Sequence, residues 1–73
     1  ETDLREANLR KADAHGAVFH RADLRMADLR GTDMSTADLT EARLTGALAS
    51  EHTRWPADFD HAAAGVVDTD DPG

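Results

Sequence analysis

Ala22-Asp23-Leu24-Arg25-Met26 is followed at once by Ala27-Asp28-Leu29-Arg30-Gly31, so one five-residue phrase occurs twice in succession. The phrase runs in phase from Thr2 to Ala49 of the 73-residue chain. A small residue, usually alanine, lies two positions before the centre of each copy, and aspartate or asparagine usually lies one position before it. Ala14 is one centre, and the other centres are large and apolar: Leu4, Leu9, Phe19, Leu24, Leu29, Met34, Leu39 and Leu44.

A period of five residues excludes both regular secondary structures. In an α-helix each residue advances about 100°, so successive centres would lie about 140° apart and form no apolar face. In a flat strand an odd spacing places successive centres on opposite faces. The pattern therefore predicts a chain that turns a corner after every phrase and points each centre at a common axis. Short repeats of fixed period form solenoids, whose units bury a core only by stacking.

The phrase closely resembles the A(D/N)LXX repeat of the pentapeptide repeat proteins, and residues 1–49 carry this resemblance. It implies an all-β solenoid, a right-handed quadrilateral β-helix with four phrases per coil and about two and a half coils. Residues twenty apart are then expected to stack. The predicted structural core consists of the large centres Leu4, Leu9, Phe19, Leu24, Leu29, Met34, Leu39 and Leu44.

Departures from the phrase mark places of special interest. Val18 is apolar where aspartate is usual, and Met26 and Leu48 occupy positions predicted to face outward. These last two side chains indicate a contact surface, a covered region or single exposed apolar residues, which are common in proteins. Arg43 in place of aspartate and Ala49 in place of leucine indicate the end of the array.

After Ser50 the periodicity is expected to stop. The next block resembles a C-terminal segment of the form TRWP-x-x-FD-x-x-AAG, found after the repeats of some family members. A solenoid end exposes apolar side chains and unpaired strand edges. We therefore predict that residues 50–67 form a cap, in which Trp55 and Phe59 pack on the last coil near Leu44 and Leu48.

A short helix is expected within this cap. Asp60 precedes three alanines and Gly65, an arrangement that predicts an N-cap, one or two helical turns and a C-terminal glycine. Residues 68–73 are acidic and contain Pro72, so they are expected to form a disordered tail.

The net charge of −7 is unevenly distributed. Residues 1–49 carry nine acids and seven bases, a net charge of −2, whereas the remaining residues carry six acids and only Arg54. Aspartate before a centre and arginine after it, as in Asp23-Leu24-Arg25, should both project outward and partly neutralise each other. A solvated surface of mixed charge is therefore favoured over a single-signed field that steers a basic partner.

Catalysis and cofactor binding have little support. No serine or threonine lies at a recognisable spacing from a histidine. His15 and His20 are expected on adjacent faces, and His52 and His61 lack a third ligand at a metal-like spacing. The chain has no cysteine. We therefore expect no catalytic residues, no metal and no cofactor.

Interactions with nucleic acids and membranes are also not expected. No basic patch is interleaved with aromatic residues. No apolar run is long enough to cross a membrane, and no segment has the pattern of a secretory signal. These observations leave a protein as the expected class of partner.

The leading hypothesis is a non-enzymatic structural or protein-interaction module, with a partner that the sequence does not identify. Thr2-Asp3-Leu4 is already in phase, so we expect a part of a longer repeat protein. The first coil would present an unpaired strand edge, which predicts either further coils or a homodimer through the N-terminal end.

The family resemblance implies an alternative. Some pentapeptide repeat proteins are DNA mimics that bind DNA gyrase or topoisomerase IV and protect against their inhibitors. That role requires a long acidic face. About two and a half coils spaced by roughly 4.8 Å are only about 12 Å tall, and the repeat region is almost neutral.

Overall fold

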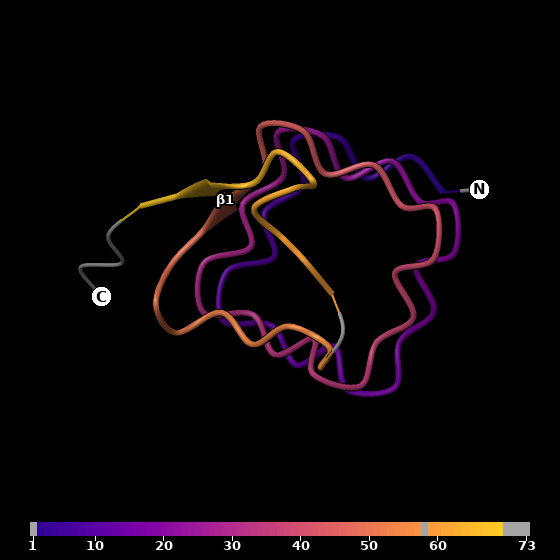
Figure 1. The fold of residues 1–73 in the computed structure, drawn as a ribbon, viewed down its shortest axis with the longest axis horizontal. Coiled ribbons are helices and arrows are strands. Elements are labelled where there is room, and N and C mark those ends of the chain that lie inside the picture. The colour runs from indigo at the N-terminus through magenta and orange to yellow at the C-terminus, as the bar shows by residue number, and fades with distance from the viewer. Residues whose placement is uncertain (1, 58, 70–73) are drawn as a thin grey trace.

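The structure is a computed structural model that describes residues 2–57 and 59–69. Two short strands are present in this part of the chain, β1 (Leu48–Ala49) and β2 (Val67–Asp68). They pair in parallel, with Leu48 opposite Val67 and Ala49 opposite Asp68. Figure 1 shows successive turns of the chain lying over one another around a common interior.

Single parallel β-bridges connect the remaining turns in four columns. Most bridges join residues twenty apart, as the repeat predicted. The columns are Asp3–Asp23–Arg43, Asn8–Asp28–Leu48, Asp13–Asp33–Arg54 and Val18–Asp38. Because β2 pairs with Leu48, it adds a further level to the second of these columns.

A turn at the end of each phrase produces the corners. In one such turn the N–H of Ala27 donates to the carbonyl oxygen of Leu24 at 3.0 Å. The third residue of this turn, Met26, has a φ of 65°, as a type II turn requires. Glycine adopts positive φ freely, whereas another residue loses about 1–2 kcal/mol there. Positive φ recurs at the same position in Glu6, Lys11, Gly16, Arg21, Gly31, Glu41 and Gly46.

The aspartate of the phrase stabilises the turn that comes after it. Oδ1 of Asp23 accepts a hydrogen bond from the backbone N–H of Arg25 at 3.2 Å. Aspartate and asparagine are suited to this contact because their short side chains reach the backbone two residues on. The same bond joins Asp3 to Arg5, Asn8 to Arg10, Asp13 to His15, Asp28 to Arg30, Asp33 to Ser35 and Asp38 to Thr40.

The core lies in the middle of the stack. Large buried centres and small buried residues two positions before them fill it: Ala22, Leu24, Ala27, Leu29, Met34, Ala37, Leu39, Leu44 and Ala47. The centres of the first coil, Leu4, Leu9 and Phe19, pack against this cluster but are only half-buried. Burial is incomplete there because no described residue covers the N-terminal side of these side chains.

The ladder of parallel bridges continues for one more phrase after Ser50, although the five-residue spacing is broken there. The N–H of Arg54 donates to Thr32 O at 3.0 Å, and the N–H of Met34 donates to Arg54 O at 2.9 Å. The bridge between Asp33 and Arg54 spans one residue more than the bridges before it, because the preceding turn contains an inserted residue. Trp55 therefore comes after Arg54 at the position of a phrase centre, in register with Met34.

The helix predicted after Asp60 does not form. Oδ1 of Asp60 accepts the N–H of Ala63 at 3.1 Å, and its carbonyl oxygen accepts the N–H of Ala64 at 3.2 Å. The chain then reverses at Gly65, whose φ is 86°. The carbonyl oxygen of Gly65 accepts the N–H of Gly46 at 2.9 Å, so pairing with the previous coil replaces a second helical turn.

Residues 68 and 69, the first two of the predicted disordered tail, are paired with the previous coil. Asp68 belongs to β2, and the N–H of Thr69 donates to Ala49 O at 2.7 Å. The rest of that predicted tail, residues 70–73, lies outside the described residues. Leu48, which the sequence placed at an outward position, is half-buried where β2 pairs with β1.

Candidate interaction surfaces

Ion pairs cover two adjacent faces of the stack. Nε and Nη2 of Arg25 donate to the two carboxylate oxygens of Asp23 at 2.8 and 2.7 Å. Arg30 binds Asp28 in the same way at 2.8 and 2.6 Å. Two parallel charge-assisted hydrogen bonds are the strongest form of this contact. The side-chain hydrogen bonds from Arg25 lower the pKa of Asp23 from 3.8 to about 2.

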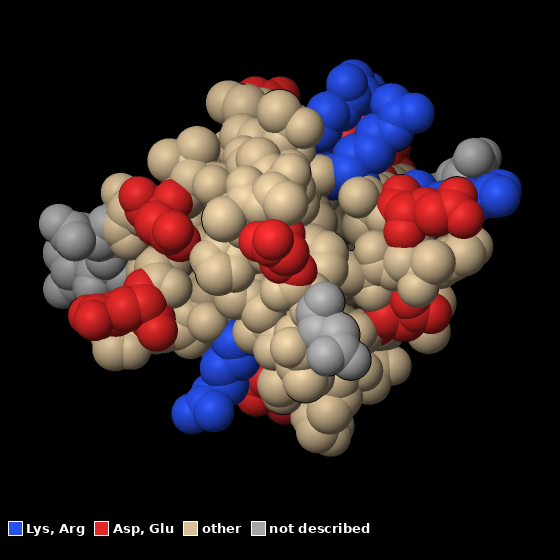
Figure 2. Space-filling view, viewed as in Figure 1, with Lys and Arg blue, Asp and Glu red and all other residues tan. Residues whose placement is uncertain are grey.

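The paired charges give the repeat surface the mixed character that was expected. Arg5 binds Asp3 at 2.9 Å and approaches Asp23 of the next coil at 3.8 Å. The same column ends in Arg43, so its acids do not continue along the molecule. In Figure 2, acidic side chains lie at separate places across the visible face, and basic side chains gather mainly near one edge.

The histidines do not assemble into a site. His15 and His20 come after different bridge columns, as their spacing predicted. Among the described residues, no three histidine, aspartate or glutamate side chains are arranged to hold a metal ion. No helix in this part of the chain is long and apolar enough to cross a membrane.

Three large apolar side chains are exposed among the described residues. Val18, Met26 and Val67 are 74%, 63% and 48% exposed. The sulfur of Met26 occupies the space that a Cβ atom at Gly46 would need. Gly46 also has positive φ, so both its backbone and its neighbour favour glycine. Val18 belongs to the fourth bridge column, whereas Met26 lies in the turn after Leu24.

The N-terminal edge of the ladder is open in the described part of the chain. In the second coil the N–H of Asp23 donates to Thr2 O at 2.8 Å. The corresponding N–H groups of the first coil belong to Asp3, Asn8, Asp13 and Val18, and none has an acceptor among the described backbone groups. Such an edge can template pairing with another chain.

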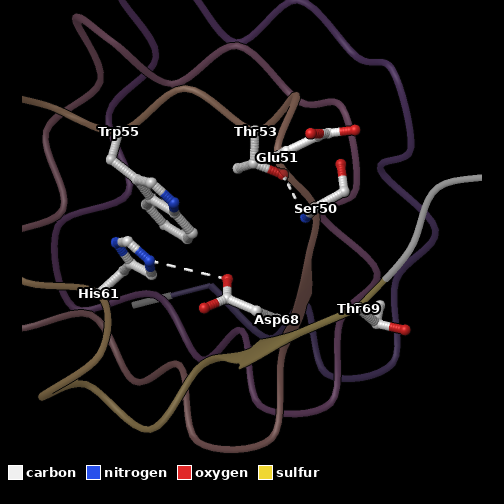
Figure 3. A pocket seen from close by; sticks show the side chains of 7 residues that line it. All are labelled: Ser50, Glu51, Thr53, Trp55, His61, Asp68 and Thr69. Atoms are coloured by element: carbon white, nitrogen blue, oxygen red, sulfur yellow. Dashed lines mark hydrogen bonds and ion pairs between the residues drawn. The ribbon is translucent and has the colours of Figure 1, made fainter.

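A polar hollow of about 510 Å³ lies at the opposite end (Figure 3). Its wall combines the inserted turn, Trp55, the turn after Asp60 and the end of β2. Seven residues line it: Ser50, Glu51, Thr53, Trp55, His61, Asp68 and Thr69. We call this feature the C-terminal hollow.

An aromatic stack borders the C-terminal hollow. The rings of Trp55 and His61 are almost parallel, at 4°, with centroids 5.0 Å apart. Trp55 also stacks on Phe59 at 5.4 Å and 22°. Nε2 of His61 lies 3.7 Å from Oδ1 of Asp68 (Figure 3). The sequence placed Trp55 and Phe59 in a cap but did not place His61 and Asp68 beside them.

The residues of the C-terminal hollow are brought together by non-local pairing. The inserted residue before Thr53 and the return of the chain at Gly65 give no periodic signal. The detectable signals were indirect: the only tryptophan and six of the fifteen acids come after Ser50. These signals indicated a special segment without indicating its geometry.

Comparison with known protein families matches the pentapeptide repeats, in eight copies, over residues 1–35 and 19–51. Among solved structures, the chain is similar to alr5209, a pentapeptide repeat protein from Nostoc PCC 7120. The two are 34% identical with a TM-score of 0.73, over 92% of this chain and 60% of that one.

A second similar structure is Rfr23, a pentapeptide repeat protein from the cyanobacterium Cyanothece 51142. It is 34% identical, with a TM-score of 0.71, over 73% of this chain and 36% of that one. The chain therefore spans less than two thirds of the length of either protein. No curated protein matches it.

Proposed function

Because the chain belongs to the pentapeptide repeat family, we propose that it is a rigid module that works by binding a protein rather than by catalysis. The observation that carries this proposal is the regular ladder of parallel bridges, which holds the outward side chains in fixed columns. The first coil leaves backbone N–H groups of this ladder without described acceptors. Rigid side chains lose little entropy on binding, which favours association.

The winding that we propose is a right-handed, four-sided β-helix of about two and a half coils. Four bridge columns and the twenty-residue spacing support it. The structural neighbours are pentapeptide repeat proteins, which form a β-helix. In such a coil each face contributes one parallel bridge per turn, so side chains in one column stay in register over the whole stack.

The partner that we propose for the N-terminal end is a second copy of the chain. Leu4, Leu9 and Phe19 are half-buried there, next to backbone N–H groups without described acceptors. A second copy would cover these apolar centres and supply acceptors to the edge. A two-fold arrangement is favoured because it uses the same surface on both copies and closes without further growth.

Sedimentation equilibrium over a range of concentrations tests this pairing. Val18→Pro removes an edge N–H that has no described acceptor and an exposed side chain, so it should weaken the dimer while the monomer stays folded. Asp68→Pro is the matched control, because it alters the outer edge at the opposite end. A monomeric wild-type chain, or equal effects of both prolines, would contradict the proposed dimer.

Mimicry of DNA is less well supported as a function. The carboxylates of Asp3, Asp23 and Asp28 are each bound by an arginine two residues on. Their charges are therefore partly neutralised, whereas a DNA mimic requires an extended unneutralised row. Arg43 also interrupts the first acidic column. No specific contact among the described residues favours gyrase or topoisomerase IV as the partner.

A further inference from the structure

We propose that the C-terminal hollow receives an arginine side chain from a protein partner. This inference rests on the proposed function as a protein-binding module and names the chemistry of a second binding surface. It is independent of the N-terminal edge, which lies at the other end of the ladder.

Two carboxylates of the C-terminal hollow lack the arginine partners found elsewhere on the molecule. In the described part of the chain, the ion contact of Glu51 is His52 at 3.7 Å, and that of Asp68 is His61 at 3.7 Å. The side chains of Glu51 and Asp68 are 86% and 69% exposed. In contrast, Asp28 receives two short hydrogen bonds from Arg30. A guanidinium from outside would give the hollow the contact that the repeat faces make internally.

The charge around the C-terminal hollow also favours a cation. Its lining contains two acids, Glu51 and Asp68, and neither lysine nor arginine. Arg54 is adjacent to Trp55 in sequence but does not line the hollow. The resulting negative potential concentrates cationic groups and raises their association rate.

The aromatic wall favours arginine over lysine. A guanidinium is planar, stacks on aromatic rings and offers five donors, whereas an ammonium is a compact and strongly hydrated charge. Trp55 and His61 both line the hollow, and Nε2 of His61 lies 3.7 Å from the carboxylate of Asp68, so a guanidinium bound there would contact aromatic side chains. The volume of about 510 Å³ exceeds that of one side chain, so neighbouring residues of the partner can enter with the arginine.

Other ligand classes fit less well. A metal ion would need a group of three suitable ligands, which the described residues do not provide. A nucleic acid would bring negative phosphates toward the carboxylates of Glu51 and Asp68. A positively charged protein segment is therefore the occupant that the lining chemistry supports.

Fluorescence of Trp55 provides the test, because it is the only tryptophan in the chain. The probe is the capped peptide Gly-Gly-Arg-Gly-Gly. It is compared with two peptides in which the arginine is replaced by neutral citrulline or by positively charged lysine. We expect saturable binding of the arginine peptide in the millimolar range, because only a few contacts form. Binding of the citrulline peptide should be at least about tenfold weaker, since a charge-assisted bond contributes about 1.5–3 kcal/mol.

Charge-removing variants localise the binding. Glu51→Gln and Asp68→Asn should each weaken the arginine peptide about fivefold to tenfold, while far-ultraviolet circular dichroism reports an unchanged fold. Glu6→Gln is the matched control, because it removes an acid from the first coil. Equal binding of arginine and citrulline peptides, equal weakening by the control, or tighter binding of duplex DNA would overturn the proposal.

Measurement on the Val18→Pro variant separates this proposal from the proposed dimer. Arginine-peptide binding should persist in the monomeric variant, because its residues belong to the opposite end of the ladder. Loss of dimerisation with retained peptide binding supports the hollow as an independent site. If the chain forms the dimer but its fluorescence does not change with the arginine peptide, the proposed arginine site is wrong and the proposed dimer is unaffected.

Discussion

The hydroxyl of Thr53 donates to the carbonyl oxygen of Leu29 at 2.8 Å, although 24 residues separate them. The hydroxyl oxygen of Thr53 also accepts the N–H of Ser50 at 3.0 Å and that of Gly31 at 3.2 Å. Thr53 is only 8% exposed. One buried hydroxyl therefore holds the inserted turn against the previous coil and returns the chain to the register in which Arg54 pairs with Asp33.

Replacement of Thr53 by valine should destabilise the protein by about 1–3 kcal/mol. The change keeps the shape of the side chain but leaves buried backbone groups without this hydrogen-bond partner. Urea unfolding followed by Trp55 fluorescence measures the difference. Thr45→Val is the control, because Thr45 is exposed. Equal stability of the two variants would show that the hydroxyl does not hold the turn.

Replacement of Leu29 by alanine should lower the free energy of unfolding by about 2–5 kcal/mol. Leu29 is fully buried in the middle coil, so the substitution leaves a cavity among tightly packed neighbours. Leu9→Ala is the matched control, since Leu9 precedes Leu29 by twenty residues and is only half-buried. Thermal unfolding of both variants, compared as monomers in the Val18→Pro background, measures the difference. A larger loss of stability for Leu9→Ala than for Leu29→Ala would show that the core is not centred on the middle coil.

Acid should weaken the fold through the paired aspartates. The pKa of Asp23 is lowered to about 2 by hydrogen bonds from Arg25, so the folded state binds its proton less readily than the unfolded state. Its contribution to stability is present above the unfolded pKa of about 3.8 and is lost as the pH falls toward 2. Hydrogen bonds also lower the pKa values of Asp3, Asp28, Asp33 and Asp38.

Carboxyl-carbon NMR titration of Asp23 measures this shift directly. In the Arg25→Gln variant the pKa of Asp23 should rise toward its ordinary value, because its largest favourable contact is lost. Glu6→Gln serves as the control, since Glu6 lies outside the pair. An unchanged titration of Asp23 in the Arg25 variant would show that the ion pair does not form in solution.

Trp55→Ala should destabilise the fold by about 3 kcal/mol, the lower end of the range for buried aromatic residues, because Trp55 is half-buried. The indole packs against the core and stacks on Phe59 and His61. Trp55→Phe should recover part of the stability through stacking. A fully water-exposed emission spectrum together with a harmless alanine substitution would exclude a structural role and leave Trp55 as a binding residue only.

The sequence alone determined the regular part of the molecule. Turn, centre and preceding aspartate recur within each five-residue phrase, so the information needed to place Leu24 in register with Leu44 is local and repeated. Because the same turn recurs after every phrase, residues twenty apart always stack in the same way. The columns were therefore predictable from residues 2–49. The hydrogen bond from the N–H of Arg25 to Asp23 was not predicted, because the sequence shows only that aspartate recurs.

Only the tertiary structure decided the path of the chain after Ser50. There the register depends on a hydrogen bond between Thr53 and Leu29 and on pairing of β2 with β1, contacts that join residues 19 to 24 positions apart. Asp60 begins a turn with the local chemistry of a helix start, yet pairing of Gly65 with Gly46 favours reversal over a second helical turn. The C-terminal hollow exists because these non-local contacts bring Trp55, His61 and Asp68 together, and no local pattern encodes that meeting.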